Sequence, residues 1–300
     1  MTRKATTVST PGISELTRLR ATRPEAVLDA ARRRRRRPLL SGGGRVLIIA
    51  ADHPARGALG VAGRPLAMAS RPDLLERLCV ALERPGVDGV LATPDILEDL
   101  LLLGALEGKV VVGSMNRGGL AGAAFEMDDR FTAYRAADIE RFRFDAGKLL
   151  LRIDESDPGS LATMAGAARA VTELAERGLT ALVEPFMARR VGGRVRNDLS
   201  AAAVVRSAAI ASGLGATSAY TWLKVPLTEN AGDMARVAEA TTLPLVLLGG
   251  DVPDDADATF DRWHQALRLP SVYGLVAGRT LLYPPGDDVA AAVDTAVRLL

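Results

Sequence analysis

Two patterns of apolar and polar residues alternate along the chain from about residue 45 onwards. Short apolar runs rich in β-branched residues are followed by longer stretches rich in Ala, Leu, Arg and Glu, in which apolar residues recur every three to four positions. The first pattern is typical of buried strands and the second of amphipathic helices. The chain is therefore predicted to consist of repeated βα units.

The repeat predicts eight strands. Eight alternating units in about 250 residues fit an α/β fold of the single (β/α)8 TIM-barrel type better than an open doubly wound sheet. No Gly-x-Gly-x-x-Gly fingerprint follows the first strand, which weakens the doubly wound alternative further. The predicted strands are Val46–Asp52, Val87–Thr93, Val110–Ser114, Lys148–Asp154, Ala181–Pro185, Ala219–Val225, Leu245–Gly249 and Tyr273–Ala277. Helices are expected between them, for example over Asp73–Glu83, Leu161–Arg177, Ala201–Ser212 and Met234–Ala240.

The chain divides into an N-terminal helical and basic extension over residues 1–44 and a catalytic barrel domain over residues 45–300. The extension contains a run of six arginines, Arg32–Arg37, in a chain whose net charge is only +2. Such a run can bind nucleic acid. Because no aromatic residues are interleaved with it, we expect a solvated helix end instead. A regulatory protein that binds nucleic acid stays open as the non-enzymatic alternative.

Composition narrows the class of protein further. Hydrophobic residues make up 48% of the chain and aromatic residues only 4%, which fits an α/β core of Ala, Val, Leu and Ile. The single cysteine, Cys79, cannot form a disulfide within the chain. No apolar stretch reaches the roughly 18 residues of a membrane helix, and the N-terminus lacks the apolar segment of a secretory signal. We expect a cytoplasmic protein without a membrane partner.

Lysine is scarce in this chain. Only Lys4, Lys109, Lys148 and Lys224 are lysines, and every other basic residue apart from the two histidines is arginine. A lysine inside an apolar strand then points to a need for an amine that can lose its proton, which a guanidinium cannot do. Lys148 and Lys224 both lie in predicted strands.

Charged residues occupy four of the predicted strands near the end where barrel enzymes carry their chemistry. Burying them is costly unless they pair or act. Lys224 is the candidate for a Schiff base with a carbonyl substrate, and a second cation such as Lys148 would make its amine easier to deprotonate. Glu184 is the candidate proton shuttle, and Asp52 could orient a lysine or a substrate hydroxyl. Alternatively, Lys148 and Glu184 could simply neutralise each other.

The seventh predicted strand ends in a Gly-Gly pair and the eighth in a Gly-Arg pair, at the usual phosphate site of such barrels. The candidate phosphate or substrate ligands are Gly249, Gly250, Gly278 and Arg279, together with Arg152 on the fourth strand. Glycine also ends strands in ordinary turns, so this alternative stays open.

Other segments carry weaker signals. His53 and His264 form no metal-binding motif, so neither a metal nor another cofactor is expected. The arginine-rich segment Ala188–Asp198 could be a lid for an anionic substrate or a solvated loop. Asn116–Gly119, which follows the third strand, has the same ambiguity.

These residues resemble the class I aldolases of the tagatose-bisphosphate, fructose-bisphosphate and deoxyribose-phosphate group, over roughly residues 45–300. The tagatose-bisphosphate type is the most similar. Its first strand ends in Asp-Gln-Arg-Gly, and this chain has the same turn with two residues inserted at Asp52–Gly57. Its Lys-Phe-Leu-Leu, Leu-Glu and Leu-Lys-Val strands are similar to Lys148–Leu151, Val183–Glu184 and Leu223–Val225.

The resemblance implies that Lys224 forms the Schiff base and that Lys148 and Glu184 assist proton transfer. One departure concerns the catalytic tyrosine of the archaeal-type fructose-bisphosphate branch. The aligned residue here is Phe186, so proton transfer would fall to Glu184 or another group.

We therefore predict a metal-independent class I aldolase, a carbonyl lyase acting on a phosphorylated sugar or keto-sugar acid and releasing dihydroxyacetone phosphate. Similarity to actinobacterial aldolases that we associate with inositol breakdown favours 5-dehydro-2-deoxy-phosphogluconate, which would also give malonate semialdehyde. Tagatose or fructose bisphosphate, deoxyribose phosphate, and a phosphate-binding isomerase or decarboxylase without an imine stay open. The expected partner is the small-molecule substrate, and the chain is expected to form a homo-oligomer.

Overall fold

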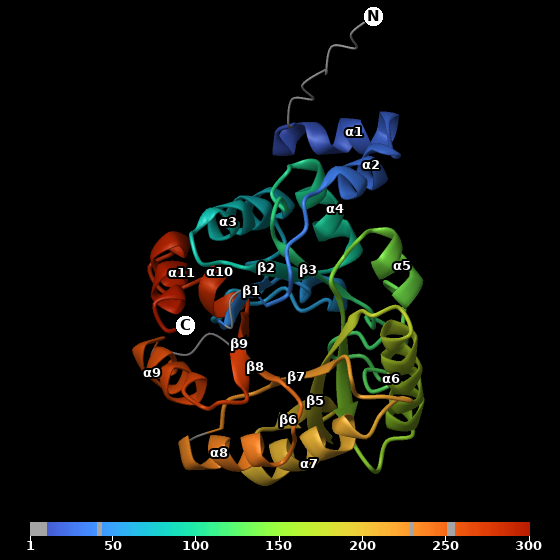
Figure 1. The fold of residues 1–300 in the computed structure, drawn as a ribbon, viewed down its shortest axis with the longest axis vertical. Coiled ribbons are helices and arrows are strands. Elements are labelled where there is room, and N and C mark those ends of the chain that lie inside the picture. The colour runs from blue at the N-terminus through green and yellow to red at the C-terminus, as the bar shows by residue number, and fades with distance from the viewer. Residues whose placement is uncertain (1–10, 41–43, 229–230, 251–255) are drawn as a thin grey trace, which may run out of the picture.

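The short apolar runs form the strands of a closed barrel. A computed structural model of the chain describes residues 11–40, 44–228, 231–250 and 256–300. Eight parallel strands follow the order β4-β3-β2-β1-β9-β8-β7-β5, and pairing of β4 with β5 closes the ring (Figure 1). The TIM-barrel prediction is confirmed. The strands are β1 (Val46–Ala50), β2 (Gly89–Ala92), β3 (Val110–Ser114), β4 (Ala146–Ile153), β5 (Thr180–Val191), β7 (Thr221–Val225), β8 (Leu245–Leu248) and β9 (Val272–Ala277).

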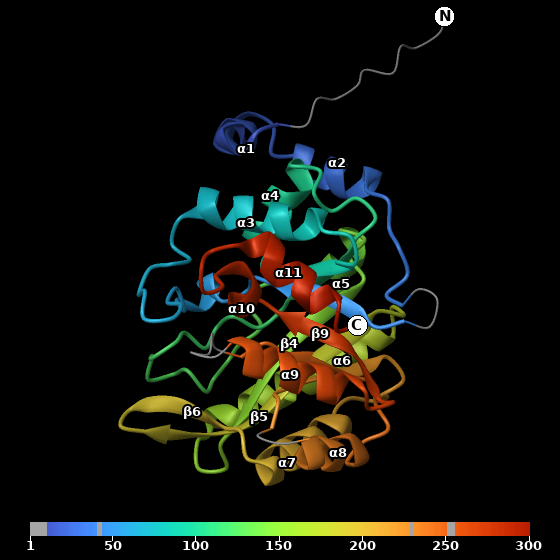
Figure 2. The ribbon, with the colours of Figure 1, turned by 90° about the vertical axis from the view of Figure 1, so that its left-hand side faces the viewer.

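Helices surround the barrel, as the alternating pattern predicts (Figures 1 and 2). All four helices named from the sequence form, with their ends within three residues of the expected positions. The helices of the barrel are α3 (Arg71–Glu83), α4 (Pro94–Leu102), α5 (Ala136–Arg141), α6 (Gly159–Ala175), α7 (Ala201–Ser212), α8 (Ala231–Glu239), α9 (Ala256–Leu267), α10 (Arg279–Leu282) and α11 (Val289–Val297). The short helix η2 (Pro54–Arg56) follows β1.

The fifth strand is longer than expected. It was predicted to end at Pro185, but β5 continues to Val191 and returns as the antiparallel strand β6 (Arg194–Asp198). The segment Ala188–Asp198, expected to be a lid or a solvated loop, is a hairpin and not a loop, and its role as a lid stays a prediction. Figure 2 shows this β5–β6 hairpin projecting from one end of the barrel.

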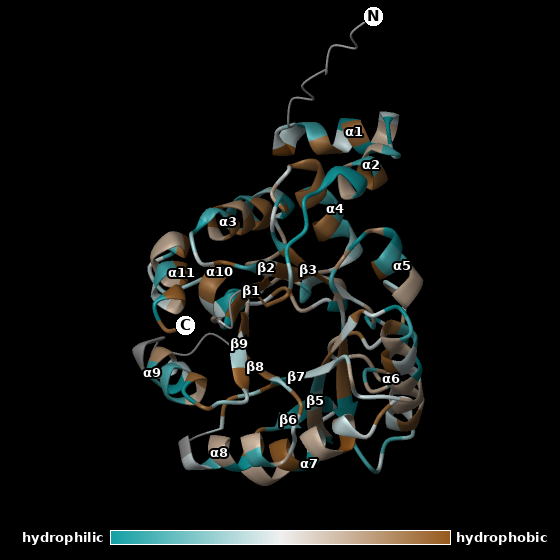
Figure 3. Ribbon diagram, in the orientation of Figure 1, coloured by the Kyte–Doolittle hydropathy of each residue, from teal (hydrophilic) through white to brown (hydrophobic). Residues whose placement is uncertain are grey.

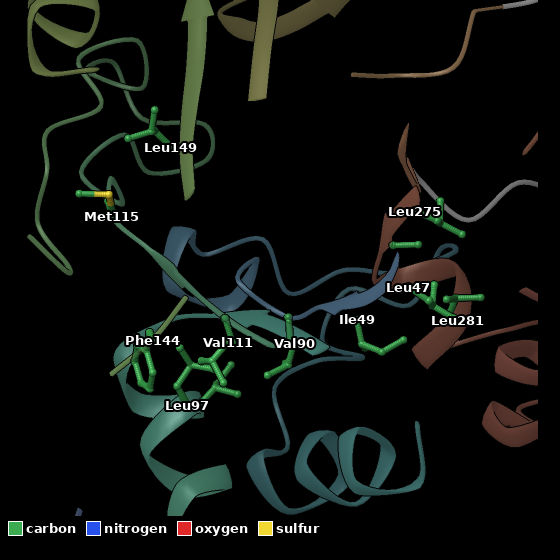
Figure 4. Close-up of a cluster of buried hydrophobic side chains, with 14 of the residues drawn as sticks. Leu47, Ile49, Val90, Leu97, Val111, Met115, Phe144, Leu149, Leu275 and Leu281 are labelled. Carbon is green, nitrogen blue, oxygen red and sulfur yellow. The ribbon is translucent and has the colours of Figure 1, made fainter. Parts of the chain in front are cut away.

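Alternate residues of each strand face either the helices or the barrel interior, because side chains on a strand alternate between its two faces. The outward residues pack under the helices into one large cluster. In Figure 4, Leu47 of this cluster lies beside Leu281, and Leu97 lies beside Val111 and Phe144. Figure 3 shows that the helices around the barrel carry both apolar and polar residues. The inward residues form a second cluster: Val46, Ile48, Ala50, Leu91, Val110, Val112, Ala146, Leu182, Val246 and Val276.

The same alternation places the charged strand residues inside the barrel. On β5, Leu182 belongs to the inner cluster, and Glu184 lies two residues further along the same face. On β4, Ala146 is followed in the same way by Lys148, and on β7 the inward Trp222 is followed by Lys224. The strand period therefore carries these groups to the carboxyl end of the barrel interior.

The N-terminal segment packs against the barrel. It forms η1 (Ile13–Glu15), α1 (Leu16–Thr22) and α2 (Ala26–Arg33), whose apolar side chains join the outer core cluster. After α2 the chain crosses the amino ends of the strands, where Leu39 and Leu40 pack on the inner cluster. The barrel is thus covered at the end opposite to the one that carries the charged strand residues.

Three arginines of the run anchor this crossing, whereas Arg32 and Arg33 at the end of α2 are exposed, as expected for a solvated helix end. Arg34 is buried and donates to the backbone oxygens of Lys109 and Arg143 over 2.7 and 2.6 Å. Arg36 pairs with Asp145, the residue before β4, at 2.8 Å. Arg37 pairs with Asp88, just before β2, at 2.6 Å. These contacts engage three of the six arginines, while Arg32, Arg33 and Arg35 stay exposed.

The buried Arg34 offers a test of this anchoring. Replacing Arg34 with Ala leaves the carbonyls of Lys109 and Arg143 without their donors, so the free energy of unfolding should fall by about 3 kcal/mol. The side chain of the neighbouring Arg35 is 83% exposed, so this residue serves as the control. Arg35→Ala should change the free energy of unfolding by about 0.5 kcal/mol or less. Urea unfolding of both variants makes the comparison. Equal losses would contradict a specific role of Arg34.

Candidate active site

One cavity at the carboxyl ends of the strands collects every site residue predicted from the sequence. Its volume is about 490 Å³. The predicted residues that line it are Asp52, Lys148, Arg152, Glu184, Lys224, Gly249, Gly250, Gly278 and Arg279. They come from six strands or the turns that follow them, so the closed barrel is what brings them together.

The centre of the cavity floor is a carboxylate shared by two lysines. Glu184 Oε1 lies 2.8 Å from Lys224 Nζ, and Glu184 Oε2 lies 2.5 Å from Lys148 Nζ. All three side chains are buried. This geometry follows from the strand order, because β5 lies between β4 and β7 and Glu184 is therefore flanked by both lysines.

Asp52 extends the network on the other side of Lys148. Its Oδ2 lies 3.0 Å from Lys148 Nζ and accepts a hydrogen bond from Ser114 Oγ at 3.1 Å. Arg117 pairs with the same oxygen at 3.0 Å and donates to the Asp52 backbone oxygen. Asp52 thus contacts a lysine, as expected for a group that orients one.

The charges of this network act on one another strongly. Burial opposes ionisation of Glu184, but the ammonium groups of Lys148 and Lys224 outweigh it and hold the pKa of Glu184 at about 2. For Asp52, burial is likewise outweighed by Arg117 and Lys148, so its pKa lies well below the usual range. Burial lowers the pKa of Lys148, and Asp52 and Glu184 offset this only in part. Glu184 is therefore a carboxylate at neutral pH.

Arg152 has a partner of its own. Its Nη1 lies 2.5 Å from Glu126 Oε1, and its Nη2 donates to the Glu126 backbone oxygen. A ligand at Arg152 would share the guanidinium with this buried carboxylate. Its assignment as a substrate ligand stays a prediction.

Several cavity residues were not among the predicted site residues. Arg117 comes from the Asn116–Gly119 segment, whose role the sequence left ambiguous. Arg56 lines the cavity and contacts both Asp129 and the backbone oxygen of Gly119. Asp129, the partner of Arg56, lies in a stretch without periodicity, so no local pattern marks it.

His53 also lines the cavity, next to Asp52. Burial, together with the nearby Arg279, lowers the pKa of His53 to about 3. Its imidazole is therefore neutral at physiological pH. Among the residues that the structure describes, no group of three or more His, Cys, Asp or Glu side chains is placed to hold a metal ion.

The glycines after β8 and β9 form one wall of the cavity with Arg279. A side chain at Gly278 would place its Cβ 2.1 Å from the backbone oxygen of Ala50, so close packing against β1 requires glycine there. Gly250 has φ +70°, which favours glycine in a turn. The backbone structure alone thus explains why glycine occupies both positions. Phosphate binding stays a prediction based on their location beside Arg279.

The β5–β6 hairpin contributes another part of the cavity rim. Val195, Arg196, Asn197 and Leu199 line the cavity from this side. The sequence pointed to this segment through its arginines, but its strand pairing was missed.

Comparison with known proteins places the chain in a family. A family model described as Cgl0159-like matches residues 44–297. The chain belongs to the Cgl0159-like family. The crystal structure of Cgl0159 from Corynebacterium glutamicum (Brevibacterium flavum) is 54% identical in sequence, with a TM-score of 0.93 over 97% of this chain and 98% of that one. Among the curated proteins, none matches.

This Cgl0159-like chain also shares its fold with aldolases. An archaeal fructose 1,6-bisphosphate aldolase is 16% identical, with a TM-score of 0.64 over 91% of this chain and 98% of that one. A second structure of an archaeal fructose-1,6-bisphosphate aldolase has its catalytic Lys covalently bound to the carbinolamine intermediate of the substrate. It is 16% identical to this chain, with a TM-score of 0.63 and the same coverage of both chains. The fructose-bisphosphate aldolase from Slackia heliotrinireducens is 16% identical, with a TM-score of 0.59 over 97% and 87%. At this identity the likeness shows a common fold, while the particular aldolase group stays a prediction.

One further finding concerns the membrane. No helix in the described ranges of this Cgl0159-like chain has both the length and the apolar character needed to cross a bilayer.

The low pKa of Glu184 predicts a specific pH dependence of stability. Since its folded value of about 2 lies below the ordinary 4.5, the ionised group stabilises the fold at neutral pH. This contribution is lost as the pH falls from about 5 towards 2. Glu184→Gln should therefore be less stable than the wild type at neutral pH, and the gap should narrow through that window.

Urea unfolding at several pH values between about 7 and 3 measures this gap. Glu155→Gln is the matched control, because Glu155 pairs with Arg206 on the surface and both side chains are more than half exposed. It should follow the wild-type profile. A gap for Glu184→Gln that is constant across the whole range would contradict the account.

Proposed function

We propose that this protein is a class I aldolase, a lyase that cleaves or forms a carbon–carbon bond through a Schiff base on Lys224. The observation that carries the proposal is the Lys224–Glu184–Lys148 arrangement on the cavity floor. It sets a buried amine beside a carboxylate that can exchange protons with it. The fold shared with Schiff-base-forming aldolases supports the same conclusion.

The first half of the reaction captures the substrate ketone. Lys224 first gives its ammonium proton to Glu184, and the resulting neutral amine attacks the carbonyl carbon while Glu184 passes that proton to the carbonyl oxygen. The nitrogen then releases a proton to Glu184, and the Lys148 ammonium protonates the hydroxyl, which leaves as water. Glu184 passes its proton back to Lys148. The product is a positively charged iminium that can accept an electron pair.

The second half breaks the carbon–carbon bond. Glu184 accepts the proton of the hydroxyl on the β-carbon, which becomes the aldehyde. The electron pair of the broken bond moves into the iminium and gives an enamine. Glu184 returns its proton to the enamine carbon, and hydrolysis of the resulting iminium releases the ketone and restores the Lys224 ammonium.

The proposed substrate is a phosphorylated sugar or keto-sugar acid, which releases dihydroxyacetone phosphate. Its phosphate would bind at the wall formed by Gly249, Gly250, Gly278 and Arg279, where backbone groups and a guanidinium can surround an anion. Among such substrates we favour 5-dehydro-2-deoxy-phosphogluconate, with malonate semialdehyde as the second product. Fructose or tagatose bisphosphate and deoxyribose phosphate are the other compounds to assay.

Borohydride trapping tests the Schiff base directly. Reduction in the presence of dihydroxyacetone phosphate should fix the ketone to Lys224, and peptide mass spectrometry can locate the adduct among only four lysines. Lys224→Met should form no adduct and should lose at least about 1000-fold in cleavage rate, because it lacks the nucleophile.

Lys109→Met is the matched control. Lys109 lies at the amino end of β3, where its Nζ donates to the Val87 backbone oxygen, and its replacement should leave trapping intact. If neither phosphorylated ketones nor the candidate sugar substrates give an adduct on Lys224, the Schiff-base proposal is wrong. A barrel isomerase or decarboxylase that works without an imine is then favoured.

Glu184 should control turnover rather than substrate affinity. Glu184→Gln keeps the shape of the side chain but removes the proton acceptor, so kcat should fall by about 100- to 10,000-fold while KM stays near the wild-type value. A coupled assay of dihydroxyacetone phosphate release gives both constants, with Glu155→Gln as the control. Unchanged kcat would assign the proton transfer to another group.

A further inference from the structure

The β5–β6 hairpin carries a cation at the rim of the cavity. We propose that Arg196 on this hairpin binds an anionic group of the aldehyde fragment, so that the enzyme prefers aldehydes that carry a carboxylate or a phosphate. This inference rests on the proposed aldolase function. It adds that the hairpin side of the cavity selects for a negative charge on the aldehyde.

The strand order gives the cavity a direction. Lys224 on β7 lies between β8 and β9 on one side and β5 on the other. The glycine and Arg279 wall follows β8 and β9, whereas Glu184 and the hairpin belong to β5. If the phosphate of the ketone fragment lies at the first wall, the rest of the substrate extends past Glu184 towards the hairpin. The leaving aldehyde therefore lies on the Arg196 side.

The hairpin is held in place over this side. In the β5–β6 ladder, Arg196 lies opposite Arg189 and Asn197 lies opposite Ala188 in the strand register. Arg190 joins the hairpin to neighbouring loops, because its Nη2 donates to the Ala124 backbone oxygen at 2.5 Å and its Nε to Asp157 at 3.3 Å. The rim residue is thus carried on a paired and anchored strand.

Arg196 differs from the buried arginines of the cavity. Arg117, Arg152 and Arg56 pair with Asp52, Glu126 and Asp129. Arg196 is exposed, and within the described part of the chain no ion pair or side-chain hydrogen bond engages its guanidinium. An incoming anion would meet a donor that no internal carboxylate neutralises.

The surface around Arg196 suits a short acidic chain. Phe186, Val195 and Leu199 supply apolar lining on the same side of the cavity, and Asn197 adds an amide. Such a surface contacts one or a few carbon atoms and leaves the charged end at Arg196. A short aldehyde ending in a carboxylate or phosphate has this shape.

Aldol addition to dihydroxyacetone phosphate tests the proposal with matched aldehyde pairs. Malonate semialdehyde is compared with propanal, and glyceraldehyde 3-phosphate with glyceraldehyde, so each pair differs chiefly in the anion. The wild type should favour the charged member of at least one pair in kcat/KM, and the pair that shows this separates carboxylate from phosphate recognition. Arg196→Gln should reduce that preference about 10- to 100-fold, mainly through the KM of the charged aldehyde.

Three controls make the result specific. Arg194→Gln, on the same hairpin but outside the cavity lining, should keep the wild-type preference. Arg196→Lys should keep part of it. Borohydride trapping of dihydroxyacetone phosphate on Lys224 should be unchanged in Arg196→Gln, because the ketone binds on the other side.

The outcomes separate this inference from the proposed function. If Arg196→Gln keeps the wild-type preference, or loses charged and neutral aldehydes equally, the role of Arg196 is wrong while an adduct on Lys224 still supports the aldolase. If the wild type itself forms no adduct, both proposals fall.

Discussion

A single carboxylate shared by two buried lysines is the interaction on which the rest of the site depends. Neither ammonium group could stay in the apolar barrel interior without a counter-charge, and Glu184 supplies it to both. Asp52 and Arg117 complete the network, so that buried charges of both signs alternate across the cavity floor. The structural and chemical explanations of Glu184 therefore do not compete, since the group that neutralises the lysines is also the one that can move their protons.

The fold turns this network into a cavity with one open end. Strand alternation carries the lysines and Glu184 inward at the carboxyl ends, while Leu39 and Leu40 cover the inner core at the amino ends. The arginine run fixes that cover to the strand starts through Asp88 and Asp145. Each of these carboxylates also accepts a backbone hydrogen bond from a neighbouring strand, at Leu47 and Val111 respectively. The extension thus contributes to the barrel on which the site is built.

The sequence predicted the fold and the central residues because both depend on local signals. Strand and helix periods are visible in short windows, and a lysine such as Lys224 stands out in an apolar strand of a lysine-poor chain. Contacts between distant segments were missed. Arg34 bonds to residues 75 and 109 positions away, and nothing near it in sequence marks those partners. The strand predicted over Ala181–Pro185 stops short of the hairpin, whereas the β5 ladder with β4 continues through Pro185 to Met187.

A crystal structure of the protein soaked with dihydroxyacetone phosphate is the most direct test of the central claim. The account predicts continuous electron density from Lys224 Nζ to the ketone carbon, with the phosphate at Gly250 and Arg279 and Glu184 within hydrogen-bonding distance of the bound carbon chain. A ketone that binds in the cavity without a bond to Lys224, or that is attached to Lys148 instead, would contradict it.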